Sequence, residues 1–413
     1  MHPSRRRLAV PAIPLTALLT ALLTALLTAL ASAAPPPLLA QRGNKAPKRP
    51  SLGERADTND WQAYFQYGMQ AMRNRPDKAA DAFAWAGRLD PSRPEPLYAE
   101  WAARWMSKPR VLAEYFQGAE YLVNSADVQR LDSLYYRATL RNPFIHQSLV
   151  RLMLASVYDS RYGAGHWEWS TDPENLAWLA YTEGRFEDAA RGFGDALAKA
   201  PRKVDLHLYR ARALFMARDF DGTLAELSVL LDDLRKKDRK RLVYFYDSKA
   251  MFEYSAGITR LMKGDHAGAR EAFGRALTED LSFYMAHGAL AGAALAQGDT
   301  AAALDEYALA VQIQGADPAL RSDYGFVLLQ ARRPAEAAEQ LTKAVALAPH
   351  YALPYYYLAH AEDAQQKYAE ALTHYAAFVQ RAPAAYAAQA AQAKERITVL
   401  NDAFAAPGGG AVK

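Results

Sequence analysis

The sequence predicts an all-α fold, a solenoid built from consecutive pairs of antiparallel helices. Three observations lead to this fold class. A short pattern recurs along the C-terminal half, and successive copies open 34 residues apart at Gly264, Gly298, Arg332 and Gln366. An Ala follows each of these openings by five residues, and a large apolar residue follows that Ala by four. Two copies close on a Pro, at Pro349 and Pro383, and Pro stops a helix.

The small and the large residue of each copy predict how its two helices pack. The small residues allow the helices to approach closely, and they are Ala269, Ala303, Ala337 and Ala371. The large residues fill the groove against the next copy, and they are Phe273, Tyr307, Leu341 and Tyr375. The opening residue breaks the chain between the two helices. One copy cannot bury its apolar face alone, so neighbouring copies must stack.

This period and these residue types resemble the tetratricopeptide repeat, in the form found in exported bacterial proteins. The resemblance implies a right-handed superhelix of helical hairpins whose first helices line a concave groove. It also implies a protein or extended-peptide partner. The specific Lys, Asn and Arg clamp of the family members that bind chaperone tails is missing here as a set, so that partner is not expected.

Length, charge and cysteine content limit the other possibilities. The 413 residues carry a net charge of +4, three of which come from Arg5–Arg7, and there is no Cys. Without that segment the chain is close to neutral, so nucleic acid is not an expected partner, because phosphate binding needs a strongly basic surface. The lack of Cys excludes disulfides and thiolate metal sites.

The N-terminus reads as a secretory signal peptide over residues 1–33. Arg5–Arg7 precede an apolar stretch, and Ala31–Ala33 form a small-residue cleavage site. We expect a mature N-terminus at Ala34 and a periplasmic or secreted protein; an uncleaved membrane anchor is the alternative. Residues Ser4–Leu8 are similar to a twin-arginine export motif, which leaves the export route open.

The region after the predicted signal peptide divides into a linker and a set of degenerate repeats. Residues 34–57 are rich in Pro and basic side chains and predict a solvated tether, or a contact with an acidic membrane or cell-wall surface. Residues 58–165 predict degenerate helical repeats in which Trp replaces small residues. Pro76 is expected in the first turn of a helix, where its missing N–H costs little.

The regular array is predicted over residues 166–383, with a capping helix over 384–403 and a frayed tail over 404–413. Before its first helix stands an aromatic loop, His166–Trp169, and then Asp172–Pro173, a helix start. We expect Trp167 and Trp169 to fill the seam between the two halves; a ligand-binding loop is the alternative. His166 and Glu168 alone are too few for a zinc site.

Two earlier openings at Gly184 and Arg218 also lie 34 residues apart, but the step from Arg218 to Gly264 is 46 residues. The surplus falls around Asp232–Leu242, where six basic residues gather: Arg235, Lys236, Lys237, Arg239, Lys240 and Arg241. This cluster predicts a solvated helix end, or else a basic surface for an acidic partner or lipid head groups.

The resemblance also implies which residues face the groove, because set positions of each first helix tend to contact the ligand in this family. Carried over residue by residue, these positions are Glu174, Trp178, Tyr181, Arg212, Phe215, Tyr254, Phe326, Tyr356, His360 and Asp363. The predicted groove is aromatic with few charges, which suits an extended peptide, an apolar helix or a glycan. These aromatic residues could instead pack on neighbouring repeats.

No phosphate-binding loop, nucleophile elbow, His-Glu-x-x-His motif or dinucleotide fingerprint occurs in the sequence. We therefore expect no catalytic residue, no metal and no cofactor. The predicted function is a non-enzymatic, exported scaffold that binds proteins in cell-envelope assembly or secretion. The alternatives are a carbohydrate-binding module of polysaccharide export and an enzyme that uses the His166–Glu168 loop.

Overall fold

The computed structural model describes residues 47–116, 126–144, 172–237 and 248–405, and these residues contain helices and no strand. The N-terminal helices are α2 (Trp61–Ala71), α3 (Pro76–Leu89), α4 (Pro94–Met106), α5 (Pro109–Phe116) and α7 (Ala126–Arg141). The first three array pairs are α9 (Pro173–Thr182) with α10 (Phe186–Lys199), α11 (Asp205–Met216) with α12 (Phe220–Lys237), and α13 (Lys249–Lys263) with α14 (His266–Glu279). The next three are α15 (Tyr284–Ala296) with α16 (Thr300–Ile313), α17 (Pro318–Gln330) with α18 (Pro334–Leu347), and α19 (Ala352–Ala364) with α20 (Tyr368–Arg381). A 3-10 turn, η2 (Ala384–Tyr386), leads into α21 (Ala387–Ala405).

The predicted openings coincide with left-handed backbone between the two helices of each pair. All six adopt φ between 58° and 80°, and they are Gly184, Arg218, Gly264, Gly298, Arg332 and Gln366. A left-handed residue lets the chain reverse at the end of the first helix and pair its terminal carbonyls. At Gly264, for example, the amide donates to the Leu261 carbonyl oxygen at 2.9 Å. The prediction of helical pairs broken at these positions is confirmed.

A second feature is a close contact between the two helices of a pair, at a small residue seven positions before the opening, which is Gly in some pairs and Ala in others. An added Cβ at Gly325 would lie 2.5 Å from the Leu341 side chain, so only a residue without a side chain fits there. The same contact occurs in the N-terminal half, where a Cβ on Gly68 would lie 2.5 Å from Phe83. The α2–α3 pair therefore packs like an array pair, and Pro76 begins α3 as predicted.

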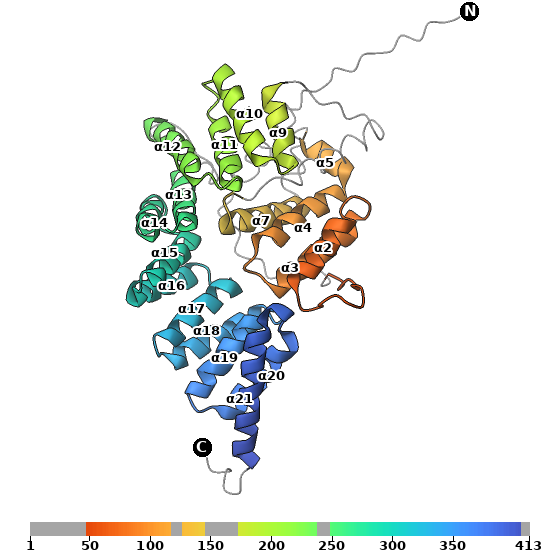
Figure 1. Ribbon diagram of the computed structural model, residues 1–413, viewed down its shortest axis with the longest axis vertical. Helices are drawn as coiled ribbons and strands as arrows, with labels where there is room; N and C mark the ends of the chain where they lie inside the picture. Colours follow the sequence, from red (N-terminus) through yellow and green to blue (C-terminus); the bar gives the residue numbers. More distant parts are fainter. Residues whose placement is uncertain (1–46, 117–125, 145–171, 238–247, 406–413) are drawn as a thin grey trace, which may run out of the picture.

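The array forms an arc, and the N-terminal helices lie inside it. Figure 1 shows α9 to α21 following each other around one side of the molecule, with α3, α4 and α7 on the inner side of this path. Along the arc each helix packs against the next one in sequence, and α7 packs against α4. Ala393 and Leu400 of α21 are buried against α19 and α20, so α21 closes the last pair.

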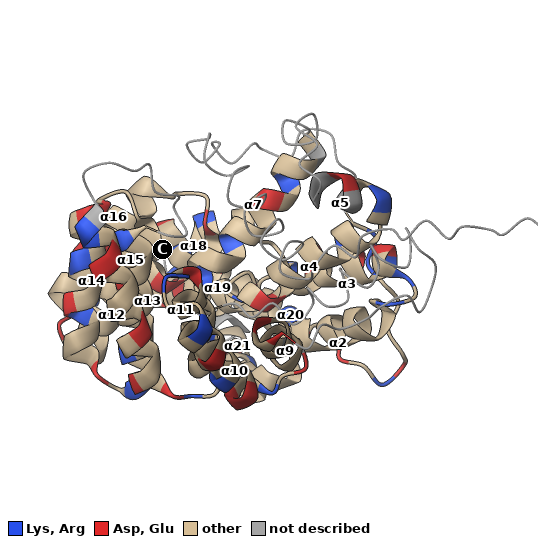
Figure 2. Cartoon of the chain, turned by 90° about the horizontal axis from the view of Figure 1, so that it is seen from above, with Lys and Arg blue, Asp and Glu red and all other residues tan. Residues whose placement is uncertain are grey.

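Charged side chains of both signs are interleaved on the outer helices. In the view from above, α10, α12 and α14 each carry basic and acidic residues side by side (Figure 2). Several of these form ion pairs between neighbouring helices, such as Arg270 with Asp299 at 3.0 Å. Such exposed pairs contribute little to stability, typically below about 1 kcal/mol each, and mainly keep the outer surface soluble.

Candidate functional site: the inner face of the array

The inner face is the side of the first helices α9, α11, α13, α15, α17 and α19 that looks into the arc. Its centre contacts the end of α7 and the three residues after it. The Leu140 side chain is 1% exposed and belongs to the core formed by α13 to α19. Phe144 is also 1% exposed and is buried among residues of α11 to α14. The end of α7 is therefore inserted into the array.

Three contacts of different kinds hold this segment. The Tyr254 hydroxyl of α13 donates to the backbone carbonyl oxygen of Leu140 at 3.0 Å. The Arg141 guanidinium donates to Asp317 Oδ2 at 2.9 Å. The Phe144 ring is stacked on Phe215 of α11, with centroids 3.9 Å apart and planes 8° apart. A backbone hydrogen bond, an ion pair and an aromatic stack are the contacts by which a groove holds a peptide segment. We call residues 140–144 the inserted segment.

The ion pair between Arg141 and Asp317 is shielded from water. The two side chains are 10% and 6% exposed. Burial by itself would lower the pKa of Arg141, but the charge and the hydrogen bond of Asp317 raise it above its ordinary value. The same carboxylate accepts hydrogen bonds from the Ala319 and Leu320 amides and so caps α17. Removal of either partner would leave the other buried without its counter-charge.

Two neighbouring charged groups have no such partner. Asp323 of α17 is exposed, yet protein surrounds its carboxylate closely enough to remove part of its hydration. This desolvation and the charges of Asp317 and Asp90 raise its pKa to about 7, against the opposing charge of Arg141. Arg137, one turn before Arg141 on α7, makes no ion pair or hydrogen bond within the part of the chain that the structure describes. Burial, followed by the charge of Arg141, lowers its pKa. The interface between α7 and the array is thus polar, with charges that are only partly compensated.

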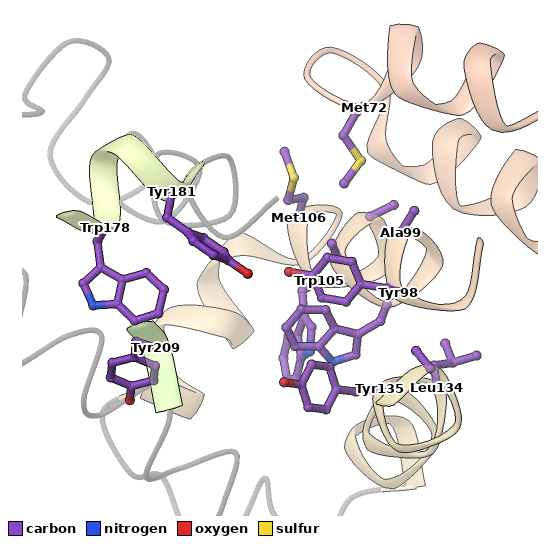
Figure 3. Packing of buried hydrophobic residues seen from close by; sticks show 14 of the residues in the cluster. Met72, Tyr98, Ala99, Trp105, Met106, Leu134, Tyr135, Trp178, Tyr181 and Tyr209 are labelled. Carbon is purple, nitrogen blue, oxygen red and sulfur yellow. The ribbon is translucent and has the colours of Figure 1, made fainter. Parts of the chain in front are cut away.

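An aromatic cluster joins the first array pairs to the N-terminal helices. Tyr98, Trp105 and Tyr135 of α4 and α7 belong to the same core as Trp178 and Tyr181 of α9. Figure 3 shows the hydroxyl end of Tyr181 directed toward Tyr98 across the boundary between the two regions. The core of the N-terminal helices is therefore continuous with that of the first repeats.

A second seam joins the two ends of the described chain. The Asn59 amide donates to the Gln380 carbonyl oxygen at 2.9 Å, and the Ala384 amide donates to Asp57 Oδ2 at 2.7 Å. The Trp85 ring of α3 contacts the His350 ring, with centroids 5.0 Å apart. The arc is thereby closed by contacts between its last pair and the start of the described residues.

Comparison with known families identifies the helical pairs. The tetratricopeptide repeat family model matches residues 175–235 and 254–319. The chain contains tetratricopeptide repeats. These matched residues run from α9 into α17, and the openings at Gly184, Arg218, Gly264 and Gln366 show that the same hairpin continues to α20. As a repeat of this family, each hairpin presents its first helix to the inner face, which agrees with the contacts described above.

Solved structures of tetratricopeptide-repeat proteins are also similar to parts of this chain. A crystal structure of MamA protein shares 16% identity over 43% of this chain and 91% of its own, with a TM-score of 0.37. YrrB, whose structure is described as having an unusual peptide-binding site, shares 19% over 50% of this chain and 100% of its own, with a TM-score of 0.40. A repeat protein from Cytophaga hutchinsonii shares 16% over 55% and 95%, with a TM-score of 0.43. No curated protein matches the chain.

Four of the six predicted groove residues of the first three repeats lie inside the protein. Trp178, Tyr181, Arg212 and Tyr254 are each at most 7% exposed. Trp178 packs edge-on against Tyr209 with ring centroids 4.7 Å apart, so this side chain holds neighbouring repeats together. In this conformation these four side chains have almost no free surface.

Three other predicted residues, in the first and the last repeat, form ion pairs or hydrogen bonds. Glu174 forms an ion pair with Lys203 at 2.6 Å. Tyr356 donates to Gln392 at 2.7 Å, and Asp363 accepts two hydrogen bonds from Arg396, each at 2.7 Å. Gln392 and Arg396 belong to α21, so the capping helix covers these inner-face positions in the last repeat.

Two predicted residues retain solvent access. Phe326 is half-buried and contacts the Tyr357 ring at a centroid distance of 5.0 Å. His360 is exposed and lies edge-on to Tyr356, with centroids 4.5 Å apart. Together with Asp323 and Tyr357, these side chains form the part of the inner face on α17 and α19 that remains open to solvent.

The residues that sequence reasoning missed are those of the inserted segment and its ion-pair partner. Arg141 ends an ordinary amphipathic helix and Phe144 follows it, and no periodicity distinguishes them from surface residues. Asp317 before Pro318 is a recognisable helix start, but a cap signal does not disclose a second partner 176 residues away.

Several predictions fall on residues that the structure does not describe. The signal peptide, the aromatic loop with His166 and Glu168, and residues 238–247 of the basic cluster lie outside the described ranges. Arg235, at the start of that cluster, pairs with Asp232 and Glu253, each at 3.2 Å. Among the described residues no helix is long and apolar enough to span a membrane, and no group of three possible metal ligands occurs.

Proposed function

We propose that this protein is a non-enzymatic, exported scaffold that binds a segment of another protein on the inner face of its repeats. The repeat fold itself is that of a protein-interaction scaffold. The observation that carries the finer proposal is that the inner face already holds a protein segment. The Tyr254–Leu140 hydrogen bond, the Arg141–Asp317 ion pair and the Phe144–Phe215 stack are contacts that an external peptide would use.

Export to the cell envelope is the second part of the proposal. It is supported by the sequence of residues 1–33, with Arg5–Arg7 before an apolar stretch and Ala31–Ala33 at its end. N-terminal sequencing of the exported protein is expected to begin at Ala34. A sequence beginning at Met1 would contradict cleavage and favour an anchored protein.

The binding proposal is tested by co-purification from the native host. The chain is tagged at its C-terminus, crosslinked gently, and the captured proteins are identified by mass spectrometry. We expect a defined envelope protein to be enriched, and Phe326→Ala with His360→Ala to reduce its capture several-fold, because both side chains reach solvent on the inner face.

A matched control is Leu309→Ala on the second helix α16, where the side chain is 44% exposed and lies away from the inner face. This control should leave capture unchanged. Equal capture by all variants would place the partner on another surface, and no enriched protein would contradict the scaffold proposal. Trp178→Ala is unsuitable as a probe, because that residue is 3% exposed and its loss would damage the fold.

A further inference from the structure

The centre of the inner face is not free, and what occupies it indicates what it binds. The inserted segment fills the space between α11, α13 and α17 with one aromatic ring, one guanidinium and one helix-end carbonyl group. Each group meets a side chain of the array that suits it: Phe215, Asp317 and Tyr254. This is the composition of a receptor for a helix end, and the chain supplies its own helix end.

We propose that this part of the inner face recognises a protein helix ending in a basic residue followed three positions later by an aromatic residue, and that the inserted segment is an internal competitor for such a partner. The inference rests on the proposed function and names the chemistry of the partner. The inserted segment supplies the pattern itself, as Arg141 and Phe144.

The interface has properties of a separable contact. It combines apolar contacts with charged ones. Leu140 and Phe144 are buried in the array, whereas Arg137 is enclosed without an ion pair or hydrogen bond in the described residues, and the charges of Glu100 and Asp317 offset its burial only in part. A charge held in this way regains its hydration when α7 leaves, which offsets part of the cost of exposing the two apolar side chains. The second seam holds the contact between the Trp85 and His350 rings and two solvent-exposed hydrogen bonds, from Asn59 and Ala384, which contribute little. A partner helix therefore has to supply only the binding free energy that the array loses when the inserted segment leaves.

The inserted segment and a free ligand compete for the same site. A tethered segment competes at an effective concentration on the order of millimolar. The apparent dissociation constant of an external ligand is therefore its intrinsic value divided by the fraction of molecules whose inserted segment has left the site. Weakening the inserted segment should strengthen binding of a free ligand, whereas weakening the receptor side chains should reduce it. An ordinary structural contact would not give these opposite signs.

The experiment uses a fluorescent synthetic peptide of residues 126–144 and the full chain. Binding is followed by fluorescence anisotropy. The variant Arg141→Ala with Phe144→Ala is expected to bind this peptide at least tenfold more tightly than the unchanged chain, because its own segment no longer competes. Adding Asp317→Asn to that variant should weaken binding about tenfold, since Asn keeps the cap of α17 but removes the charge.

Two controls separate recognition from general exposure. A peptide with Arg141→Glu and Phe144→Ala should bind the opened variant at least tenfold more weakly than the natural peptide. Because Phe144 is buried and its loss could unfold the array, Arg141→Gln alone provides a milder opened variant, and circular dichroism checks that helix content is retained.

Equal binding of both peptides, no binding to either folded variant, or no gain over the unchanged chain would overturn the inference. Light scattering during the titration distinguishes peptide binding from exchange of α7 between two copies, and exchange without peptide binding would also overturn it. These failures leave the proposed function testable, because partner capture through Phe326 and His360 depends on a different part of the inner face.

Discussion

The α2–α3 pair and the α17–α18 pair share one contact and differ in another. In both, a Gly of the first helix allows close approach of a large residue on the second, Phe83 in one and Leu341 in the other. Arg332, the residue before the N-cap of α18, is left-handed (φ 58°), whereas no residue between α2 and α3 has a positive φ; the two N-caps themselves, Arg333 and Arg75, are alike, with φ −112° and −144°. The small–large contact is therefore sufficient to make a hairpin. The left-handed residue accompanies the regular pairs, whose openings keep the 34-residue spacing.

The contacts within the array also differ from the contacts between the array and α7. Within the array the contacts between successive helices are dominated by Ala and aromatic residues that are almost fully buried. Between α7 and the array the contacts include the Arg141–Asp317 pair and the half-compensated charges of Arg137 and Asp323. The stack within the array is apolar, whereas the interface of α7 adds charged groups to the buried Leu140 and Phe144, and an interface of mixed character is easier to separate than a purely apolar one.

The largest expected effect tests whether both regions have equally tight cores. Phe83→Ala and Phe273→Ala each remove a ring that is 0% exposed, and each should lower the free energy of unfolding by about 3–5 kcal/mol. Urea unfolding followed by circular dichroism measures both. A loss below about 1 kcal/mol for Phe83→Ala alone would mean that the N-terminal pair is loosely packed.

The next effect isolates the ion pair between the regions. Asp317→Ala removes a helix cap and leaves Arg141 buried without its partner, so we expect a loss of about 3–5 kcal/mol. Asp299→Ala is the matched control, because Asp299 caps α16 and pairs with Arg270 at the surface. That loss should be about 1 kcal/mol. Equal losses in denaturant titrations would show that the contact between the regions adds nothing.

A smaller effect concerns pH. The pKa of Asp323 is about 7 in the closed structure, above its ordinary value of 3.8. The folded protein therefore binds a proton at Asp323 more tightly than the unfolded chain does. The resulting stabilisation of the folded state is fully present below about pH 4 and is lost as the pH rises to about 7.

Thermal melting between pH 5 and pH 8 is expected to show a lower melting temperature at the higher pH. The buried Asp132, whose pKa is likewise raised to about 7 by burial, contributes in the same direction. Asp323→Asn should reduce the slope without abolishing it. An unchanged slope in this variant would mean that Asp323 is hydrated like an ordinary surface carboxylate.

The smallest effect concerns the openings themselves. Arg332→Gly should stabilise the protein by about 0.5–1 kcal/mol, because a left-handed conformation costs an L-residue about 1–2 kcal/mol and Gly loses part of this gain through chain entropy. Gly298→Ala should destabilise it by about 1 kcal/mol, since φ there is 79°. Thermal melts measure both changes. If the two substitutions shifted the melting temperature in the same direction, backbone strain at the openings would not explain their effects.

The sequence by itself determined the helical pairs, because local chemistry specifies them. The 34-residue period, the Ala and aromatic positions, and the openings from Gly184 to Gln366 all act within one hairpin or between neighbours. The same reasoning placed Pro76 in the first turn of α3. It also assigned Tyr254 and Phe215 to the inner face, where both contact the inserted segment.

Only the tertiary structure decided what fills the inner face. The Arg141–Asp317 pair joins residues 176 positions apart, and the Asn59–Gln380 hydrogen bond joins residues 321 apart. Such contacts depend on the summed curvature of all the repeats between them. A small rotation at each hairpin accumulates along the array, and no short stretch of sequence records the total. The groove residues could therefore be assigned to a side of the helix, but not to a partner.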